Sequence, residues 1–256
     1  MCRAFSCIVT QKGKVYWIKG KDSHEDIIEH YKHEDNDLRD DNIPPNNTFA
    51  RIEIVPPDGD YLNLKQKWEY QIDERIKPSF LTDSYEGFCR EEFEKWKKQV
   101  YTFNIKEAKN PVNPFALKPP KITKKHIALV KQWASVRDSV WDSVGASVRD
   151  SVRDSVGDSV GDSVWDSVGD SVGDSVWASV GDSVRASVWD SVWDSVWASV
   201  WASVGAYIGS LFPIKKLKQF APAVELWKLG LVPSFDGKLW RLHGGKDAKI
   251  LWEGKF

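Results

Sequence analysis

The alternation of apolar and polar positions in the first part of the chain predicts four β-strands. Residues 3–10 and 14–19 flank a turn that contains a glycine, a pattern typical of a β-hairpin. Residues 49–55 and 68–72 alternate as half-buried strands do, and two prolines and an Asp-Gly pair lie between them. These four segments supply the β part of an N-terminal domain.

Two segments with apolar side chains at helical spacing accompany these strands. The first spans residues 22–32 and begins with Asp22, which Glu25 follows three residues later, as at many helix N-termini. The second spans residues 87–101. Strands and helices together predict a small α+β domain over residues 1–103.

Two further segments flank a central repeat. Residues 104–133 are rich in lysine and contain four prolines, which is typical of a semi-extended linker; its last residues predict a short helix. Residues 214–256 predict a short helix and then three strands joined by Asp-Gly and Gly-Gly turns. The C-terminal segment is therefore expected to form a small β-meander.

The repeat has a period of four residues. Residues 134–205 are eighteen uninterrupted copies of [Asp/Ala]-Ser-Val-[Trp/Arg/Gly], in which Ser and Val never change. In an α-helix, a Val at every fourth position drifts by about 40° per unit around the axis, so a straight helix keeps no apolar stripe. Glycine at seven of the fourth positions lowers the helix propensity further. The period therefore argues against one straight amphipathic helix.

A β-solenoid accommodates this period, because each unit can form one side of a coil with Val pointing inward. The fourth positions also show a period of twelve residues, with Trp along one edge and Gly at one corner, which a recent DNA duplication would also produce. Residues 206–213 keep the frame with bulkier apolar groups and predict a cap, so the array spans residues 134–213. The predicted fold is an α+β domain, a tetrapeptide-repeat β-solenoid and a small β-meander. Packed or supercoiled helices, and disorder, are the alternatives for the array.

Charge separates the array from its flanks. Its twelve Asp and four Arg give it a formal charge of −8, so in a chain of net charge −1 the remainder carries +7. No stretch approaches the roughly 18 consecutive apolar residues of a membrane helix. The three cysteines have no CxxC spacing, which argues against a disulfide framework and a cysteine zinc site. We expect a cytoplasmic protein, in the host cell if the chain is viral, with no cofactor and no membrane segment.

The Asp, Trp and Arg side chains of the array are the predicted binding surface. A ladder of exposed Trp would be a partner-binding surface or an oligomer seam, because large apolar patches rarely stay bare. The candidates, spaced by multiples of twelve residues, are Trp141, Trp165, Trp177, Trp189, Trp201, Asp138, Asp150, Asp162 and Asp174. The predicted function is thus a non-enzymatic structural or interaction protein that binds a protein partner or itself. An acidic solenoid that mimics DNA is one alternative.

Two other residue sets have possible chemistry. Cys2 would become the N-terminal residue after removal of Met1, the arrangement of N-terminal nucleophiles, so a Cys2-dependent hydrolase is a second alternative. The potential ligands near the first helix are His24, Glu25, His30, His33, Glu34 and Asp35. Because His24 and His30 are six residues apart and share no helix face well, a solvated acidic helix is the preferred interpretation and no metal site is predicted.

The C-terminal meander is basic and aromatic, a combination that single-stranded nucleic acids can contact. The residues concerned are Trp240, Arg241, His243, Lys246, Lys249 and Trp252. Half-buried strands show the same alternation, so nucleic-acid binding is the less favoured interpretation of this segment.

Several motifs of this chain resemble those of other proteins. The opening MCRAFSCIV, DSHEDII, the DSVx array, AYIGSLFP and the closing VPSFDGKLWRLHGGKDAKILWEG together resemble uncharacterised proteins of phage and metagenomic origin, which implies a viral or prophage setting. The array also loosely resembles the pentapeptide-repeat proteins, whose right-handed quadrilateral β-helices can mimic DNA. Here the period is four residues, and Val stands where that family has Leu.

Overall fold

The computed structural model describes residues 5–33, 48–140, 144–184 and 190–256. Its internal contacts divide the chain into two compact units, which are described separately. The first unit consists of Met1–Thr102 and Arg153–Ser163, and the second of Phe103–Val152 and Val164–Phe256. A short segment of the repeat therefore belongs to the N-terminal unit.

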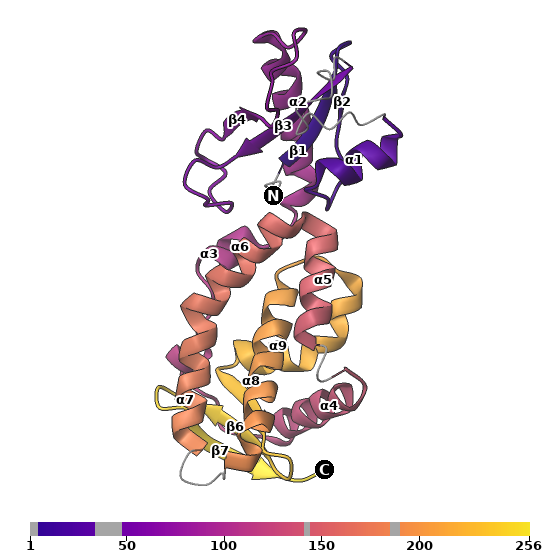
Figure 1. The fold of residues 1–256 in the computed structure, drawn as a ribbon. Coiled ribbons are helices and arrows are strands. Elements are labelled where there is room, and N and C mark those ends of the chain that lie inside the picture. Colours follow the sequence, from indigo (N-terminus) through magenta and orange to yellow (C-terminus); the bar gives the residue numbers. More distant parts are fainter. Residues whose placement is uncertain (1–4, 34–47, 141–143, 185–189) are drawn as a thin grey trace. The chain divides into compact units, whose positions relative to one another are not determined.

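The first unit is built on an antiparallel sheet with the strand order β2-β1-β3-β4 (Figure 1). Its strands are β1 (Phe5–Thr10), β2 (Val15–Tyr16), β3 (Phe49–Val55) and β4 (Glu69–Ile72). Two helices accompany it, α1 (His24–Tyr31) and α2 (Ser84–Val100). The strands and helices predicted for this part of the chain are therefore confirmed, with small differences at their ends.

Both faces of β1 are covered, which explains why nearly the whole strand is buried. On one face, the ring of Phe5 lies 5.5 Å from the rings of Phe93 and Trp96 on α2. On the other, Ile8 packs with Ile27 and Ile28 of α1. Because successive side chains of a strand point to opposite faces, one short strand organises two halves of a core.

The prediction of a β-solenoid is wrong. The repeat forms helices. The first helix begins before the repeat, and the last helix ends after it. They are α4 (Lys124–Val140), α5 (Val144–Val156), α6 (Asp158–Val168), the π-helix η3 (Gly169–Gly173), α7 (Asp174–Val184) and α8 (Asp190–Ser210). The described part of the chain is α+β, and its two sheets are small, open and antiparallel.

Interruptions of the helix explain how a four-residue period can be helical. Three units drift by only about 80° in an α-helix, within the width of an ordinary apolar stripe. The chain breaks between α5 and α6 at Gly157, whose φ is +89°. At η3 the hydrogen bonds span five residues, so each turn holds more residues and the drift reverses. The result is that each repeat Val from Val148 to Val180, together with Val196, Val200 and Val204, is buried, at most 2% exposed.

The invariant Ser is compatible with these helices because its hydroxyl bonds to the helix itself. Ser199 Oγ donates to the carbonyl of Val196 at 2.6 Å, and Ser203 Oγ donates to that of Ser199 at 3.1 Å. Ser199 Oγ also accepts the amide of Phe235 at 3.0 Å, which ties α8 to the C-terminal sheet. Both serines are fully buried without a lost hydrogen bond.

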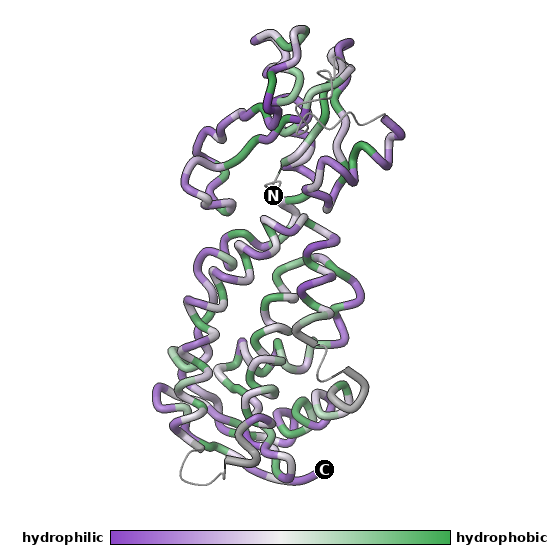
Figure 2. The backbone as a smooth tube through the Cα atoms, in the orientation of Figure 1, coloured by the Kyte–Doolittle hydropathy of each residue, from purple (hydrophilic) through white to green (hydrophobic). Residues whose placement is uncertain are grey.

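The second unit combines these helices with the predicted C-terminal elements (Figures 1 and 2). After α8 come the 3₁₀-helix η4 (Lys215–Phe220), α9 (Ala221–Lys228), and a meander of β5 (Leu231–Phe235), β6 (Trp240–Gly244) and β7 (Lys249–Gly254). α8 packs on α7, α9 and β5. Green and purple positions alternate along the repeat helices in Figure 2, in keeping with buried Val and exposed Asp.

Residues 104–133, predicted as a linker, contain packed elements. They form α3 (Ile105–Lys109), η1 (Pro114–Ala116) and the first half of α4. The amide of Val112 donates to Tyr207 Oη at 2.8 Å, and the carbonyl of Val112 accepts Trp227 Nε1 at 2.8 Å. Two buried aromatic side chains thus hold this segment against α8 and α9.

Inside the first unit, Asp22 meets the repeat segment. Its Oδ2 accepts the amide of Ser159, in the first turn of α6, at 2.9 Å. A Cβ at Gly157 would lie 2.3 Å from Asp22 Oδ1, so only glycine fits there. Burial raises the pKa of Asp22 to about 6, although the hydrogen bond from Ser159 opposes this shift.

A pH-dependent stability follows from this carboxyl group. Its folded pKa exceeds the unfolded value, so the stability that it contributes is present at acid pH and is lost as the pH rises from about 4 through about 6. Asp22→Asn should therefore stabilise the first unit at pH 7.5 by on the order of 2–3 kcal/mol, an advantage that should be mostly lost by about pH 4. Unfolding midpoints of both proteins across this range test the prediction. A difference that does not change with pH would contradict it.

Candidate functional site

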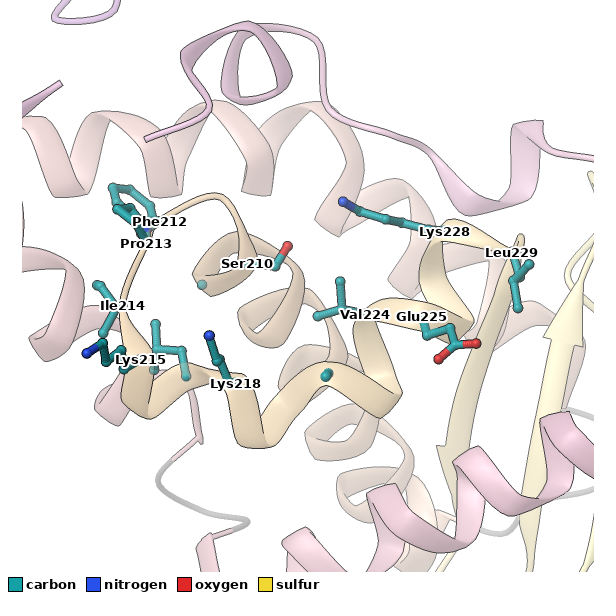
Figure 3. A pocket seen from close by; sticks show the side chains of 13 residues that line it. Ser210, Phe212, Pro213, Ile214, Lys215, Lys218, Val224, Glu225, Lys228 and Leu229 are labelled. Atoms are coloured by element: carbon teal, nitrogen blue, oxygen red, sulfur yellow. The ribbon is translucent and has the colours of Figure 1, made fainter. Parts of the chain in front are cut away.

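The second unit contains a pocket of about 720 Å³ between the end of α8, η4 and α9 (Figure 3). Its lining is mainly apolar. The apolar side chains are those of Phe212, Pro213, Ile214, Leu217, Ala221, Val224 and Leu229. Phe212 and Leu217 are buried, whereas Ile214, Val224 and Leu229 are half-buried. The volume lies in the range of ordinary small-molecule sites, about 300–1,000 Å³.

Three lysines stand around this apolar lining. Lys215 and Lys218 come from η4, and Lys228 comes from α9 (Figure 3). Lys228 Nζ lies 3.5 Å from Glu107 Oε1. In the described part of the chain, neither Lys215 nor Lys218 forms an ion pair with a carboxylate. The mouth therefore has positive charge available for an anion.

One carboxylate also lines the pocket, and it already has a partner. Glu225 Oε1 lies 2.6 Å from Lys125 Nζ on α4, an ion pair between an exposed lysine and a half-exposed glutamate. With Glu225 neutralised in this way, the lining keeps a net positive charge. The arrangement can hold an apolar chain and place an acidic group beside lysines.

A Ser–His pair elsewhere in this unit has no access to substrate. Ser234 Oγ lies 2.7 Å from His243 Nε2, and His243 Nδ1 lies 3.0 Å from the carbonyl oxygen of Ala248. Both side chains are fully buried, and burial lowers the pKa of His243 to about 4. The imidazole is thus a neutral bridge within the meander, not an exposed base.

The repeat residues predicted as a binding surface are distributed over several helices. Trp165 on α6 is half-buried, and the guanidinium of Arg149 lies 4.7 Å from the centre of its ring. Trp177 on α7 and Trp201 on α8 are also half-buried. Trp201 meets the backbone of η3, since a Cβ at Gly173 would lie 3.4 Å from its ring. These contacts belong to helix packing, so the structure does not bring the three Trp into one ladder.

The predicted acidic residues lie mostly on the surface. Asp150 and Asp174 are exposed, whereas Asp162 is half-buried and pairs with Arg153, whose Nη2 lies 3.0 Å from Asp162 Oδ1. The side chains of Trp141, Trp189 and Asp138 lie outside the described residues. The exposed Trp197, which the twelve-residue period does not select, is 49% exposed beside Trp201.

Cys2 also lies outside the described residues. Of the other two cysteines, Cys7 in β1 and Cys89 in α2 are both buried free thiols. Burial raises the pKa of the Cys7 thiol well above its usual value, which disfavours the reactive thiolate. Neither described cysteine has the exposure of a nucleophile.

The structure separates the histidines that the sequence grouped near the first helix. The rings of His30 and His33 contact Tyr31 and Tyr16 respectively. His24 instead points to the sheet, where one ligand atom each of His24, Glu53 and Asp73 lie within 4.8 Å of one another. Sequence reasoning missed both carboxylates, because only strand pairing brings them to His24.

In the basic meander, three of the side chains considered for nucleic-acid contact are buried. Trp240 and His243 lie in the interior, and Arg241 pairs with Asp236 at 2.5 Å. Lys246 and Lys249 are exposed.

Comparisons with protein-family models, curated proteins and solved structures give no match to this chain. In the described part of the chain, no helix combines the length and apolar character needed to cross a membrane.

Proposed function

We propose that the protein is a non-enzymatic binding protein whose pocket at η4 and α9 takes an amphipathic anion, such as a long-chain carboxylate. The observation that carries this proposal is the combination of an apolar lining with lysines at its mouth. An apolar chain gains on the order of 0.8 kcal/mol for each buried methylene. A pocket of about 720 Å³ has room for a chain of this kind.

The positive charge of the lysines favours a ligand with an anionic head group. Lys215 and Lys218 lie three residues apart in the 3₁₀-helix η4. Side chains at this spacing in a 3₁₀-helix point the same way. A carboxylate between them would form charge-assisted hydrogen bonds. A neutral alcohol of the same chain length would bury the same apolar area without these bonds, so it is expected to bind more weakly.

Calorimetric titration of the full chain with hexadecanoate tests the proposal. We expect one molecule to bind per chain, and Lys218→Glu to weaken binding by about tenfold through loss of one charged contact. Val224→Asp should abolish binding, because it places a carboxylate inside the apolar lining. Val224 is half-buried, and the unfolding midpoint of the variant shows whether it retains its fold.

The matched control is Lys246→Glu, which makes the same charge change on the exposed turn between β6 and β7. It should bind hexadecanoate as the unaltered chain does. Equal affinity in the Val224→Asp protein, or equal affinity for hexadecanol and hexadecanoate, would refute the proposed pocket function.

The partner-binding, self-assembly and Cys2-dependent functions expected from the sequence stay predictions. The observations that keep a surface function open are the exposed Asp side chains of the repeat helices and the half-exposed Trp197. The size of the full chain in solution, with and without Trp197→Ser, tests self-association through this residue.

A further inference from the structure

We infer that Glu107 is a specificity-determining residue of the pocket at η4 and α9. It occupies Lys228 and so limits the ligand to a chain with one acidic group, a monocarboxylate whose head lies at η4. This inference rests on the proposed function and narrows its ligand class. Glu107 belongs to α3, and Lys228, which lines the pocket, is the last residue of α9. Both residues belong to the second unit.

The three lysines of the pocket are not equivalent. Lys228 Nζ lies 3.5 Å from Glu107 Oε1, so its charge already has a carboxylate partner. In the part of the chain that the structure describes, Lys215 and Lys218 form no ion pair with a carboxylate. Figure 3 shows Lys228 apart from these two lysines, at the C-terminal end of α9. The positive charge available to a ligand is therefore at the η4 end of the pocket.

Two further donors hold the Glu107 carboxylate in place. Asn104 Nδ2 donates to Glu107 Oε2 at 2.7 Å, and Tyr207 Oη donates to Glu107 Oε1 at 3.1 Å. The amide of Glu107 also donates to Asn104 Oδ1 at 3.2 Å, so these two residues are joined by two hydrogen bonds. Tyr207 is fully buried, and the Glu107 side chain is 18% exposed. The carboxylate therefore cannot turn away from Lys228 without losing these hydrogen bonds.

The start of α3 is attached to the segment that lines the pocket. The amide of Asn104 donates to the carbonyl of Leu211 at 2.9 Å. The next residue, Phe212, belongs to the lining, and its ring centre lies 4.8 Å from that of Phe103. The position of Glu107 beside the pocket is thus fixed by backbone and packing contacts as well as by its own side chain.

A second acidic group on the ligand would meet this carboxylate. At the η4 end, one carboxylate of the ligand can bond to Lys215 and Lys218. At the α9 end, a second carboxylate would have to share Lys228 with Glu107, and two carboxylates at one ammonium group repel each other. A methyl end avoids this repulsion and gains free energy from burial beside Leu229. The pocket therefore discriminates against a dicarboxylate through an unfavourable contact.

Solvent limits the size of this discrimination. The Lys228 side chain is 48% exposed, so water and salt screen its interactions with both carboxylates. We therefore expect a difference in affinity of about fivefold to tenfold between a monocarboxylate and the matching dicarboxylate. The difference should decrease as the salt concentration rises, because the repulsion between the carboxylates is screened.

Calorimetric titration of the full chain with hexadecanoate and with hexadecanedioate tests this inference. These acids differ only in the group at the far end of the chain. We expect the unaltered chain to bind hexadecanoate at least about fivefold more tightly. In Glu107→Gln, Lys228 is available to the second carboxylate, so this ratio should fall by about fivefold or more. Glu94→Gln is the matched control, since it removes the carboxylate of an ion pair with Lys97 in the first unit, and it should leave the ratio unchanged.

A double variant shows whether the change in specificity depends on Lys228. Glu107→Gln combined with Lys228→Met removes both partners, so the gain in hexadecanedioate binding seen with Glu107→Gln alone should be absent. A gain that persists in the double variant would contradict the role given to Lys228. Unfolding midpoints show whether each variant retains its fold.

Two other results would overturn the inference and leave the proposed function intact. One is an equal affinity of the unaltered chain for the two acids, a measurement that does not depend on the folding of any variant. The other is a ratio of affinities that Glu107→Gln leaves unchanged. Binding of neither acid would overturn the proposed function and this inference together.

Discussion

Val200→Asp is expected to destabilise the second unit by more than about 4 kcal/mol, because it places an unpaired carboxylate among fully buried side chains. Val200 lies in the middle of α8, which packs on α7, α9 and β5. Small domains are stable by only about 5–15 kcal/mol, so most of the margin would be lost. Denaturant unfolding followed by far-ultraviolet circular dichroism measures the change.

The repeat provides a closely matched control. Ala198 occupies the first position of the same unit, where twelve of the eighteen units carry Asp, and it is half-exposed. Ala198→Asp adds the same charge two residues away and should change stability by about 0.5 kcal/mol or less. Similar losses at both positions would show that α8 does not bury its valines as described.

Trp227→Ala should destabilise the second unit by about 3–5 kcal/mol, the usual effect of removing a large buried aromatic side chain. Trp227 is fully buried on α9, and its ring stacks on that of Tyr207 with centres 5.1 Å apart. Its Nε1 also donates to the carbonyl of Val112, so the substitution loses packing and a hydrogen bond together. Urea unfolding of the full chain measures the loss.

Two further substitutions separate these contributions. Trp227→Phe keeps most of the stacking and leaves the Val112 carbonyl without its donor, and should lose about 1–2 kcal/mol. Trp252, half-buried in β7, stacks on Phe256 near the end of the chain. Trp252→Ala should therefore have a smaller effect than Trp227→Ala. Equal losses from the two alanine substitutions would mean that Trp227 does not hold the segment around Val112.

The cluster of His24, Glu53 and Asp73 and the pocket differ in how far they could be predicted. His24 is a recognisable candidate ligand in the sequence, but Glu53 and Asp73 are 29 and 49 residues further on. Only the pairing of β3 with β4, in which Ile52 lies opposite Ile72, brings these two acids together. The pocket has no sequence signal, because it forms where η4 and α9 pack beside the end of α8.

The local sequence pattern was sufficient to predict the strands and helices of the N-terminal domain. Residues 49–55 were predicted as a strand from the alternation of apolar and polar side chains, and β3 has these same bounds. The helix at residues 22–32 was predicted from Asp22 and Glu25 at its start and from the apolar side chains that follow. α1 is present, but its N-cap is Ser23, one residue after the predicted start, and it accepts the amide of Asp26. In these segments the neighbours along the chain already favour the observed conformation.

The repeat shows what the sequence by itself determined and what it left to the tertiary structure. Its invariant Val indicated a buried position in every unit, and each repeat Val from Val148 to Val180, together with Val196, Val200 and Val204, is buried. The backbone conformation that buries these valines depends on contacts outside the repeat, because a four-residue period suits a solenoid as well as interrupted helices. The break at Gly157 and the π turn at Gly169–Gly173 correct the drift of the apolar stripe, and contacts with α9 and the C-terminal sheet stabilise the helices. A local period defines which side chains are buried, but only long-range packing decides between backbones that bury them equally well.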